Sequence, residues 1–417
     1  MYRLERGSTS YVSGLLARKL AELLREIEDK VRELGVSIRG EPLNRVGFVD
    51  GSYVLEERRG ACLVLYSASS LEVVERRSIR QYMRGSKEPL IQVLVPKTYS
   101  ESRASLLMSM LELLAGLDMV LKGVEAIFMD GSYVSALMAP FGYALDVYSR
   151  AVKAANRHLN FEVVEGMGCE ACEEIRQVLE GERDPRMCFQ SIMSVVGRYA
   201  NRLYAELCSF EELGPQWRKE ALDYSVVYFE ETAYLSILNK LLEEAGERGS
   251  SVFWVAKDSE SRYLTEREGI LGWLNDLMLL DYAWRDLESV YTKLRGVSFG
   301  KPKGHVACFK LIDEVYEKWR DYTVVYFKLG RQGVATQMTY PTRLSDELLQ
   351  EALSTLLQLS DEVHGYPRPL NYVHNLAVLN PGLARLIADE MYRRSSRGSL
   401  MRFMLAPSGR RLLGLVR

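Results

Sequence analysis

A five-residue phrase headed by an acid occurs twice in this chain. Asp50-Gly51-Ser52-Tyr53-Val54 is repeated, beginning at Asp130, as Asp-Gly-Ser-Tyr-Val. Each copy follows a short apolar run, which predicts that Asp50 and Asp130 each lie at the end of a buried strand. The glycine would turn the backbone there, and the serine would accept hydrogen bonds from the freed amides. Two carboxylates brought together repel each other unless a cation lies between them, and a divalent metal ion is the usual occupant.

Hydrolysis of phosphodiesters is the chemistry that such paired acids serve. Carboxylates hold one or two divalent ions, roughly 3.5–4 Å apart when paired, which activate water and neutralise charge on the reacting oxygens. The alternative is that both aspartates merely cap ordinary strand ends. Repetition of the whole phrase argues against that interpretation, because turn sequences usually vary.

A third acid of interest is Glu112, which lies in a predicted helix over residues 101–121. Its helical neighbours Ser109, Ala115 and Gly116 are small and would let another element approach closely. An acid on the packed side of a helix needs a partner. Either a metal ion or an arginine such as Arg103 could supply one.

Two later segments carry further candidate residues. Lys257 and Asp258 follow an apolar strand, where Lys257 could meet a scissile phosphate and Asp258 could orient it or bind metal. An ion pair at a strand end is the simpler alternative. Tyr366 ends a loop, and His374 lies one turn inside the helix that Pro369 begins, so both rings could face one site. His374 is then either a metal ligand or proton carrier, or a structural residue.

Composition indicates a folded globular protein. The chain has 417 residues, of which 47% are hydrophobic and 26% charged. Acids interrupt its longest apolar stretches, which argues against a membrane span, and residues 1–6 lack the apolar core of a signal peptide, so we expect a cytoplasmic protein.

A net charge of −2 gives no global attraction to nucleic acid, so any contact needs local basic patches. Each of two arginine-rich segments could be such a patch or a solvated face. They comprise Arg76, Arg77, Arg80 and Arg84 around Tyr82, and Arg393, Arg394, Arg397, Arg402, Arg410, Arg411 and Arg417 in the tail.

Six cysteines in a chain of this size do not indicate a secreted disulfide framework. Cys169 and Cys172 form a CxxC pair, but the spacing to Cys188 and Cys208 matches no common zinc module. A zinc ion or disulfide within the middle segment and simple reduced thiols both remain open, with reduced thiols as the default.

The order of predicted elements favours one fold class. An amphipathic helix over 8–35 precedes strands at 46–50 and 61–67, and a third strand falls at either 71–79 or 90–95. The helix over 101–121 leads into the strand that ends at Asp130. After it, the sequence predicts helices over most of 135–250, with turns at 166–168 and 184–185. Strands are predicted at 252–255, 322–329 and 334–338, and two closing helices at 345–359 and 370–394.

This order predicts an α/β protein with a ribonuclease H-like mixed sheet flanked by helices and a large helical insertion. We expect residues 1–134 to hold the opening helix and the first part of the nuclease core, 135–250 the insertion, and 251–417 the remaining core with its basic tail. In that sheet the first and fourth strands are parallel neighbours, which would bring Asp50 and Asp130 together.

Taken together, these motifs resemble the NurA nuclease family of archaea and some bacteria. The resemblance rests on the order and spacing of the first Asp-Gly-Ser, the helical glutamate, the second aspartate, the lysine-containing strand end and the Tyr-Pro with its histidine. It implies a manganese-dependent nuclease, with magnesium as the alternative ion, that cuts single- and double-stranded DNA by 5′-to-3′ exonuclease and single-strand endonuclease activity. Asp50, Glu112 and Asp130 would bind metal, and Tyr366 and His374 would complete the site.

The resemblance also implies partners. Family members are homodimers that work with a hexameric HerA-type ATPase in DNA end resection for recombinational repair. The sequence contains no GxxxxGK[ST] phosphate loop, so any ATP-driven motion must come from a partner. Two other functions stay open: a scaffold that docks a DNA translocase without cutting, and a ribonuclease H-like enzyme acting on RNA or RNA:DNA hybrids.

Overall fold

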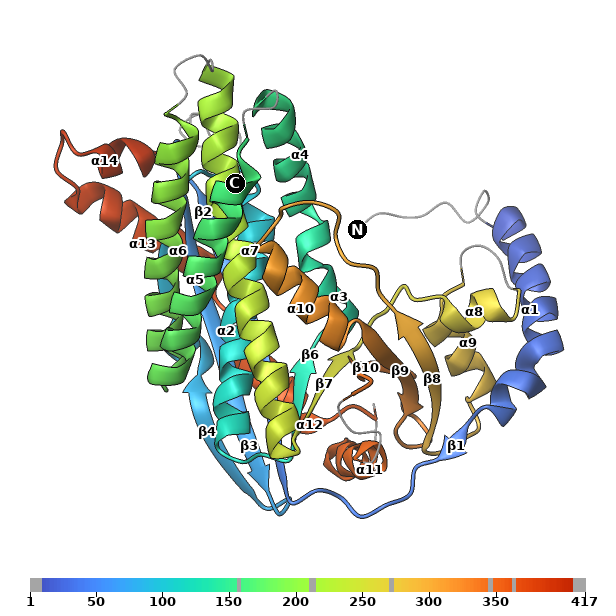
Figure 1. Cartoon of the computed structure of the whole chain (residues 1–417). Coiled ribbons are helices and arrows are strands. Elements are labelled where there is room, and N and C mark those ends of the chain that lie inside the picture. Colours follow the sequence, from blue (N-terminus) through green and yellow to red (C-terminus); the bar gives the residue numbers. More distant parts are fainter. Residues whose placement is uncertain are drawn as a thin grey trace.

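One mixed sheet organises the molecule. The computed structural model describes residues 10–155, 159–209, 215–269, 274–343, 348–361 and 365–407. Its ten-stranded sheet has the order β1-β8-β9-β10-β7-β6-β2-β3-β4, with β5 also paired to β3 (Figure 1). The strands are β1 (Val36–Ser37), β2 (Arg45–Glu57), β3 (Cys62–Val74), β4 (Ser78–Arg84), β5 (Leu90–Leu94), β6 (Ala126–Asp130), β7 (Ser251–Ala256), β8 (Val290–Ser298), β9 (Asp321–Lys328) and β10 (Thr336–Pro341).

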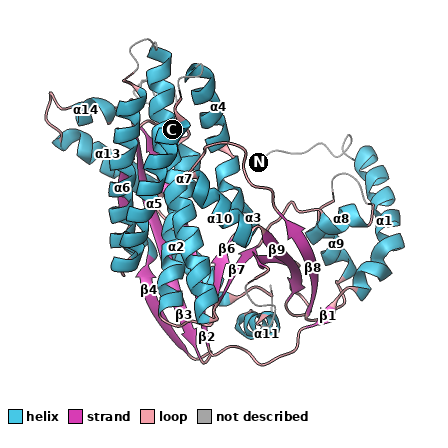
Figure 2. Cartoon of the chain, in the orientation of Figure 1, coloured by secondary structure: helices cyan, strands magenta, loops and turns pink. Residues whose placement is uncertain are grey.

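Helices make up the rest of the described regular structure apart from two short 3-10 turns (Figure 2). They are α1 (Ser10–Glu33), α2 (Ser100–Leu121), α3 (Tyr133–Met138), α4 (Tyr143–Ala155), α5 (Phe161–Gly181), α6 (Pro185–Leu207), α7 (Pro215–Arg248), α8 (Tyr263–Arg267), α9 (Asp276–Ala283), α10 (Phe309–Trp319), α11 (Leu349–Leu359), α12 (Arg368–Ala377), α13 (Pro381–Arg394) and α14 (Leu400–Met404).

The centre of the sheet is parallel. β6 pairs in parallel with β2 on one side and with β7 on the other, while β2 forms a long antiparallel hairpin with β3. The prediction that the strands carrying Asp50 and Asp130 are parallel neighbours is therefore confirmed. The mixed sheet with helices on its faces is the predicted ribonuclease H-like architecture.

Helices cover both faces of the sheet, and alternate strand residues face opposite layers. Val49 and Ile127 pack into the larger core with α2 and the long helices α5, α6 and α7. Phe48 and Phe128, one position away in each strand, stack on each other and pack against α11 and α12 in a second core. Even-numbered positions in the part of β2 that pairs with β6 therefore face α12, and odd-numbered positions there face α2.

Several sequence expectations need correction. The strand of the first repeat does not end at Asp50, since β2 continues to Glu57. Of the two candidates for the third strand, 90–95 corresponds to β5, whereas 71–79 spans the end of β3, a turn and the first residues of β4. The turn expected at 166–168 lies inside α5, where a CxxC and flanking residues keep the helical pattern. The helix expected over 370–394 is two helices, because Asn380 caps a new helix that begins at Pro381. β8 was not predicted.

α2 is a core helix. By length and composition it is the one described helix apolar enough to cross a membrane, but 67% of its apolar window is buried inside the protein. The sheet on one side and α7 on the other enclose it. Its apolar character therefore reflects its position between two layers, and it presents two acids to the cavity described below, Glu101 in its first turn and Glu112.

Candidate metal centre

Asp50 and Asp130 meet where β6 ends beside β2. The parallel pairing of the two strands runs from Val46 with Ala126 to Val49 with Met129, and Asp130 is the last residue of β6. Beyond that point β2 continues with one edge free of β6. Ligand oxygens of both aspartates and a ring nitrogen of His374 all lie within 4.8 Å of one another. The predicted convergence of the two acids is confirmed, although only the second lies at a strand end.

The two Asp-Gly pairs use their glycines differently. Gly131 has φ +102°, a conformation that favours glycine, and it turns the chain into α3, where Ser132 caps the helix by accepting from the amide of Val134. Gly51 lies within β2 and faces α2. A Cβ there would stand 2.4 Å from the sulfur of Met108 and 2.8 Å from a carboxylate oxygen of Glu112. Gly51 is therefore required for the close approach of α2.

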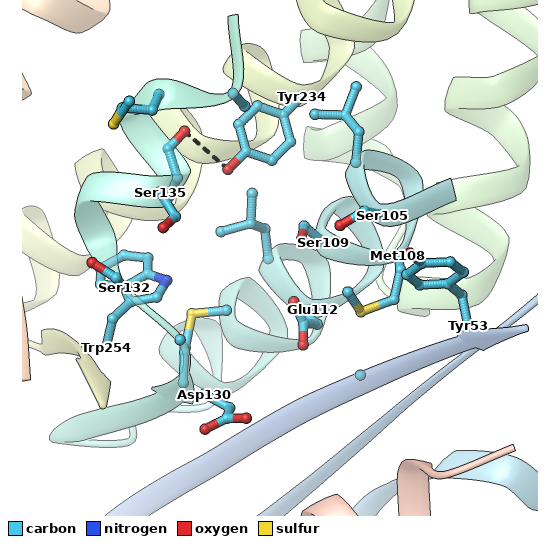
Figure 3. Close-up of a pocket in the computed structure, with 18 of the residues that line it drawn as sticks. Tyr53, Ser105, Met108, Ser109, Glu112, Asp130, Ser132, Ser135, Tyr234 and Trp254 are labelled. Atoms are coloured by element: carbon cyan, nitrogen blue, oxygen red, sulfur yellow. Dashed lines mark hydrogen bonds between the residues drawn. The ribbon is translucent and has the colours of Figure 1, made fainter. Parts of the chain in front are cut away.

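The gap at Gly51 lets Glu112 reach the two aspartates from the opposite layer. Figure 3 shows Glu112 extending from α2 toward β2, with Asp130 at the end of β6 beyond it. All three acids line one cavity of about 770 Å³. Sequence spacing alone placed Glu112 on a packed helix face; the arginine suggested as its alternative partner, Arg103, instead binds Glu230 at 2.7 Å.

His374 approaches from the other layer. Residues 48 and 50 of β2 face α12, and His374 on α12 places its Nδ1 2.8 Å from Oδ2 of Asp50. The second oxygen of Asp50 accepts from the amide of Gly51 at 2.7 Å. When Nδ1 donates to the carboxylate, the other ring nitrogen keeps a free lone pair. Asp50 thus lies between the ring that hydrogen-bonds it and a second carboxylate.

Crowding raises the pKa of two of the acids, Asp50 and Glu112. Burial, followed by the charge of Asp130, raises the pKa of Asp50 from 3.8 to about 6, against the hydrogen bond from His374. Burial and the charges of Asp50 and Asp130 raise the pKa of Glu112 well above its usual value. A cation would relieve both effects. Two carboxylates, an imidazole and a nearby third carboxylate are a donor set suited to Mn²⁺ or Mg²⁺, so these residues fit a divalent ion.

Lys257 and Tyr366 lie beside the acids and offer a cation and a hydroxyl group. Lys257 follows β7, which pairs with β6, and its Nζ lies 3.8 Å from Oδ1 of Asp130 and 5.1 Å from the centre of the Tyr366 ring. The Tyr366 hydroxyl is buried without a hydrogen-bond partner among the described residues. Burial and the two aspartates raise the pKa of Tyr366, so the hydroxyl stays protonated and offers a free donor.

Asp258 is the one predicted site residue whose side chain makes no described contact with the other residues of the centre. Its side chain is exposed, and it does not line the cavity. The first basic patch is partly neutralised, because Arg80 and Arg84 form ion pairs with Glu72 and Glu88. In the tail, Arg394 pairs with Glu390, whereas Arg410, Arg411 and Arg417 lie outside the described residues.

Sequence reasoning missed the polar lining on α2. Ser105 and Ser109 line the cavity together with Glu112, at positions i, i+4 and i+7 of an otherwise apolar helix (Figure 3). This spacing puts all three on one helix face. A polar stripe on an apolar core helix was therefore a readable signal, since buried polar groups usually serve a ligand or partner.

A ribonuclease H-like sheet with an acidic cluster where the parallel pairing of β2 and β6 ends is the arrangement of a metal-dependent nuclease. A model of the NurA domain matches residues 44–379, which is most of the chain and includes every predicted site residue. The chain belongs to the NurA family. This confirms the resemblance drawn from the motifs, and a search of the curated proteins found no match.

Solved structures agree with the fold. The NurA nuclease from Sulfolobus solfataricus is 17% identical, with a TM-score of 0.58, over 96% of this chain and 100% of that one. A structure of NurA bound to dAMP and manganese is 15% identical, with a TM-score of 0.68, over 95% of this chain and 98% of that one. A structure of NurA with manganese is 14% identical, with a TM-score of 0.60, over 92% of this chain and 98% of that one. The whole architecture, including the helical segment, is thus shared.

Proposed function

We propose that this chain is a metal-dependent deoxyribonuclease that hydrolyses phosphodiester bonds at the cavity of Asp50, Glu112 and Asp130. The observation that carries the proposal is the convergence of three acids from two helix-covered faces of one sheet, with burial and mutual repulsion raising the pKa of Asp50 and of Glu112. Membership of the NurA family supports the same activity.

Mn²⁺ is the proposed ion, with Mg²⁺ as the alternative. Asp50, Asp130 and His374 would bind it through the atoms that already lie within 4.8 Å of one another, and Glu112 would complete the set. A bound divalent ion would activate water and neutralise charge on the phosphate. The relatives crystallised with manganese support this choice.

The remaining residues would handle the phosphate and protons. Lys257 lies beside Asp130 on the open side, where its ammonium would hold a phosphate oxygen. The free hydroxyl of Tyr366 would donate a hydrogen bond to the same group. The alternative role of His374 is that of a proton carrier: Nδ1 would then keep its hydrogen bond to Asp50 and not bind the ion, and the other ring nitrogen of this half-exposed side chain would exchange protons. Asp258 stays a prediction as an orienting or metal-binding residue.

DNA is the proposed substrate, cut by 5′-to-3′ exonuclease and single-strand endonuclease activity. The dAMP in a related NurA structure is a deoxynucleotide, which supports DNA over RNA. Glu101, Ser102 and Ser105 also line the cavity, and Lys257 and bound cations would offset the acidic charge as a phosphate chain enters.

We further propose a cytoplasmic homodimer that works with a hexameric HerA-type ATPase in DNA end resection. The family resemblance suggests these partners. The exposed apolar side chains Leu386, Leu400 and Phe403 on α13 and α14 offer a surface of the kind that protein partners cover. Light scattering of the purified chain tests the dimer, and cleavage with and without an added HerA-type ATPase tests the partnership.

Cleavage assays test the activity itself. Purified protein is incubated with end-labelled DNA, RNA and RNA:DNA hybrid in Mn²⁺, Mg²⁺ or chelator, with Asp130→Ala as the inactive control. Metal-dependent cutting of DNA that Asp130→Ala abolishes is the expected result. Cutting that requires 2′-hydroxyls would instead indicate the RNA enzyme, and binding of a translocase without any cutting would indicate the scaffold.

A further inference from the structure

A second cluster of ligand-type side chains lies away from the acidic centre. Glu165 and Cys169 on α5 meet Cys308, the residue that precedes α10, and ligand atoms of all three lie within 4.8 Å of one another. Cys172, on the next turn of α5, also contacts the thiol of Cys308, although its sulfur is not among the three mutually close ligand atoms. None of these residues lines the nuclease cavity. The CxxC of the sequence therefore acquires a third cysteine from a segment about 140 residues away, in place of Cys188 and Cys208.

The spacing of the sulfur atoms suits a tetrahedral metal ion. The sulfurs of Cys169 and Cys308 are 3.9 Å apart. Zinc–sulfur bonds of about 2.3 Å in a tetrahedron put two sulfurs roughly 3.8 Å apart. A disulfide would join only two of the sulfurs at about 2.05 Å and leave the third unused. All three cysteines are free thiols in the structure.

A carboxylate completes the cluster. Oε1 of Glu165 lies 3.6 Å from the sulfur of Cys308 and 3.9 Å from that of Cys169. The same side chain accepts from the amides of Phe309 and Lys310 at the start of α10, which fixes its orientation. Its other oxygen faces Nδ1 of His305, a buried nitrogen without a hydrogen-bond partner among the described residues. Such outer contacts orient metal ligands in known sites.

The backbone is arranged for close approach at this point. A Cβ on Gly168 would lie 2.3 Å from the hydroxyl oxygen of Tyr228 and 3.2 Å from Cβ of Cys308. Only glycine therefore lets α5 come this close to α7 and to the segment before α10. Cys308 is the residue that caps the amino end of α10.

We propose that Cys169, Cys172, Cys308 and Glu165 form a structural zinc site that ties α5 of the helical segment to α10. His305, whose Nδ1 lies 3.9 Å from the second oxygen of Glu165, is a positioning residue beside that ligand. α5 and α10 lie side by side in front of the sheet, and each packs on α7 (Figure 1). A zinc ion there would add to the hydrogen bonds by which Glu165 on α5 already holds the start of α10. Four protein ligands would leave no coordination position open, so the proposed site would serve stability and not catalysis.

Metal analysis of the full-length protein tests the proposal. The measurement uses an Asp130→Ala background, because that change removes a ligand from the nuclease centre and leaves the cysteine cluster intact. Zinc content by mass spectrometry should be about one ion per chain. It should fall below about one-fifth in Cys308→Ser and stay unchanged in Cys208→Ser, a cysteine outside the cluster. Cobalt substitution should produce thiolate-to-metal charge-transfer absorption that Cys308→Ser removes.

A second measurement covers the case in which Cys308→Ser does not fold. A mercurial reagent titrated into the otherwise intact protein should release zinc in step with the modification of three thiols. Protein that holds no zinc and shows no cobalt–thiolate absorption would overturn the proposal. A Cys169–Cys308 disulfide in the unreduced peptide map of zinc-free protein would also overturn it and identify a redox pair. Either failure leaves the nuclease assignment untouched, because the sites share no residue.

Discussion

Asp50→Asn should stabilise the metal-free protein while it removes activity. Asparagine keeps the shape of Asp50 and an oxygen that can accept from Gly51, and its NH2 group can donate to Nδ1 of His374 in the other tautomer, but it carries no charge. The pKa of Asp50 is raised from 3.8 to about 6, first by burial and then by Asp130. Since each pKa unit corresponds to about 1.36 kcal/mol, the ionised side chain costs about 3 kcal/mol of folding stability at neutral pH.

The sign of the pH dependence distinguishes this reasoning from a general effect of the substitution. Because the folded-state pKa of Asp50 is raised, the native state binds a proton more tightly than the unfolded state. The cost is therefore fully present above about pH 6 and is lost as pH falls toward 3.8. The gap in stability between Asp50→Asn and wild type should be largest near neutral pH and should close toward pH 4.

Urea unfolding in the presence of chelator measures this gap. Mn²⁺ should reverse the order, because an ion at about 1,000 times its dissociation constant stabilises only the chain that binds it, by about 4.1 kcal/mol, which exceeds the gap of about 3 kcal/mol. Asp258→Asn, at an exposed acid outside the cavity, is the matched control and should change stability by less than about 0.5 kcal/mol. An Asp50→Asn protein that is less stable than wild type in chelator at neutral pH would refute the reasoning.

Three further outcomes follow from the same geometry. Glu112→Gln should weaken Mn²⁺ binding at least about tenfold by calorimetry, and unchanged affinity would remove Glu112 from the ligand set. His374→Ala should slow hydrolysis more than it weakens DNA binding, measured by single-turnover cleavage and fluorescence anisotropy; equal losses would indicate a structural role. Gly51→Ala should destabilise the fold by about 1–3 kcal/mol, because Met108 and Glu112 occupy the space of the new methyl group. Gly197→Ala, on the open face of α6, should instead be neutral or stabilising, and equal unfolding curves for the two variants would contradict the packing argument.

The acids of the centre were readable from the sequence because each belongs to a strongly patterned element. Apolar runs before Asp50 and Asp130 placed them on buried strands, and the helical periodicity around Glu112 placed it on a packed face. The fold class followed from the order of these elements. What the pattern could not give is that β2 continues past Asp50, since pairing with β3 extends a strand whose own sequence contains a glycine.

Contacts between segments that are distant in the chain could not be predicted from the sequence. Nothing in the spacing of Cys169 and Cys172 indicates Cys308 as their neighbour, because the fold of the intervening α6 and α7 sets that contact. The hydrogen bond between His374 and Asp50 likewise depends on α12 packing under β2. β8 was missed because charged Lys293 and Gly296 interrupt its apolar pattern, and pairing with β9 supplies the order that its sequence lacks.

Anomalous diffraction from crystals soaked in Mn²⁺ tests the central claim most directly. The account predicts a manganese peak between the carboxylates of Asp50 and Asp130, within coordination distance of both, and its loss in crystals of Asp130→Ala. A cavity without a manganese peak at saturating Mn²⁺, or a peak that persists in Asp130→Ala, would contradict it.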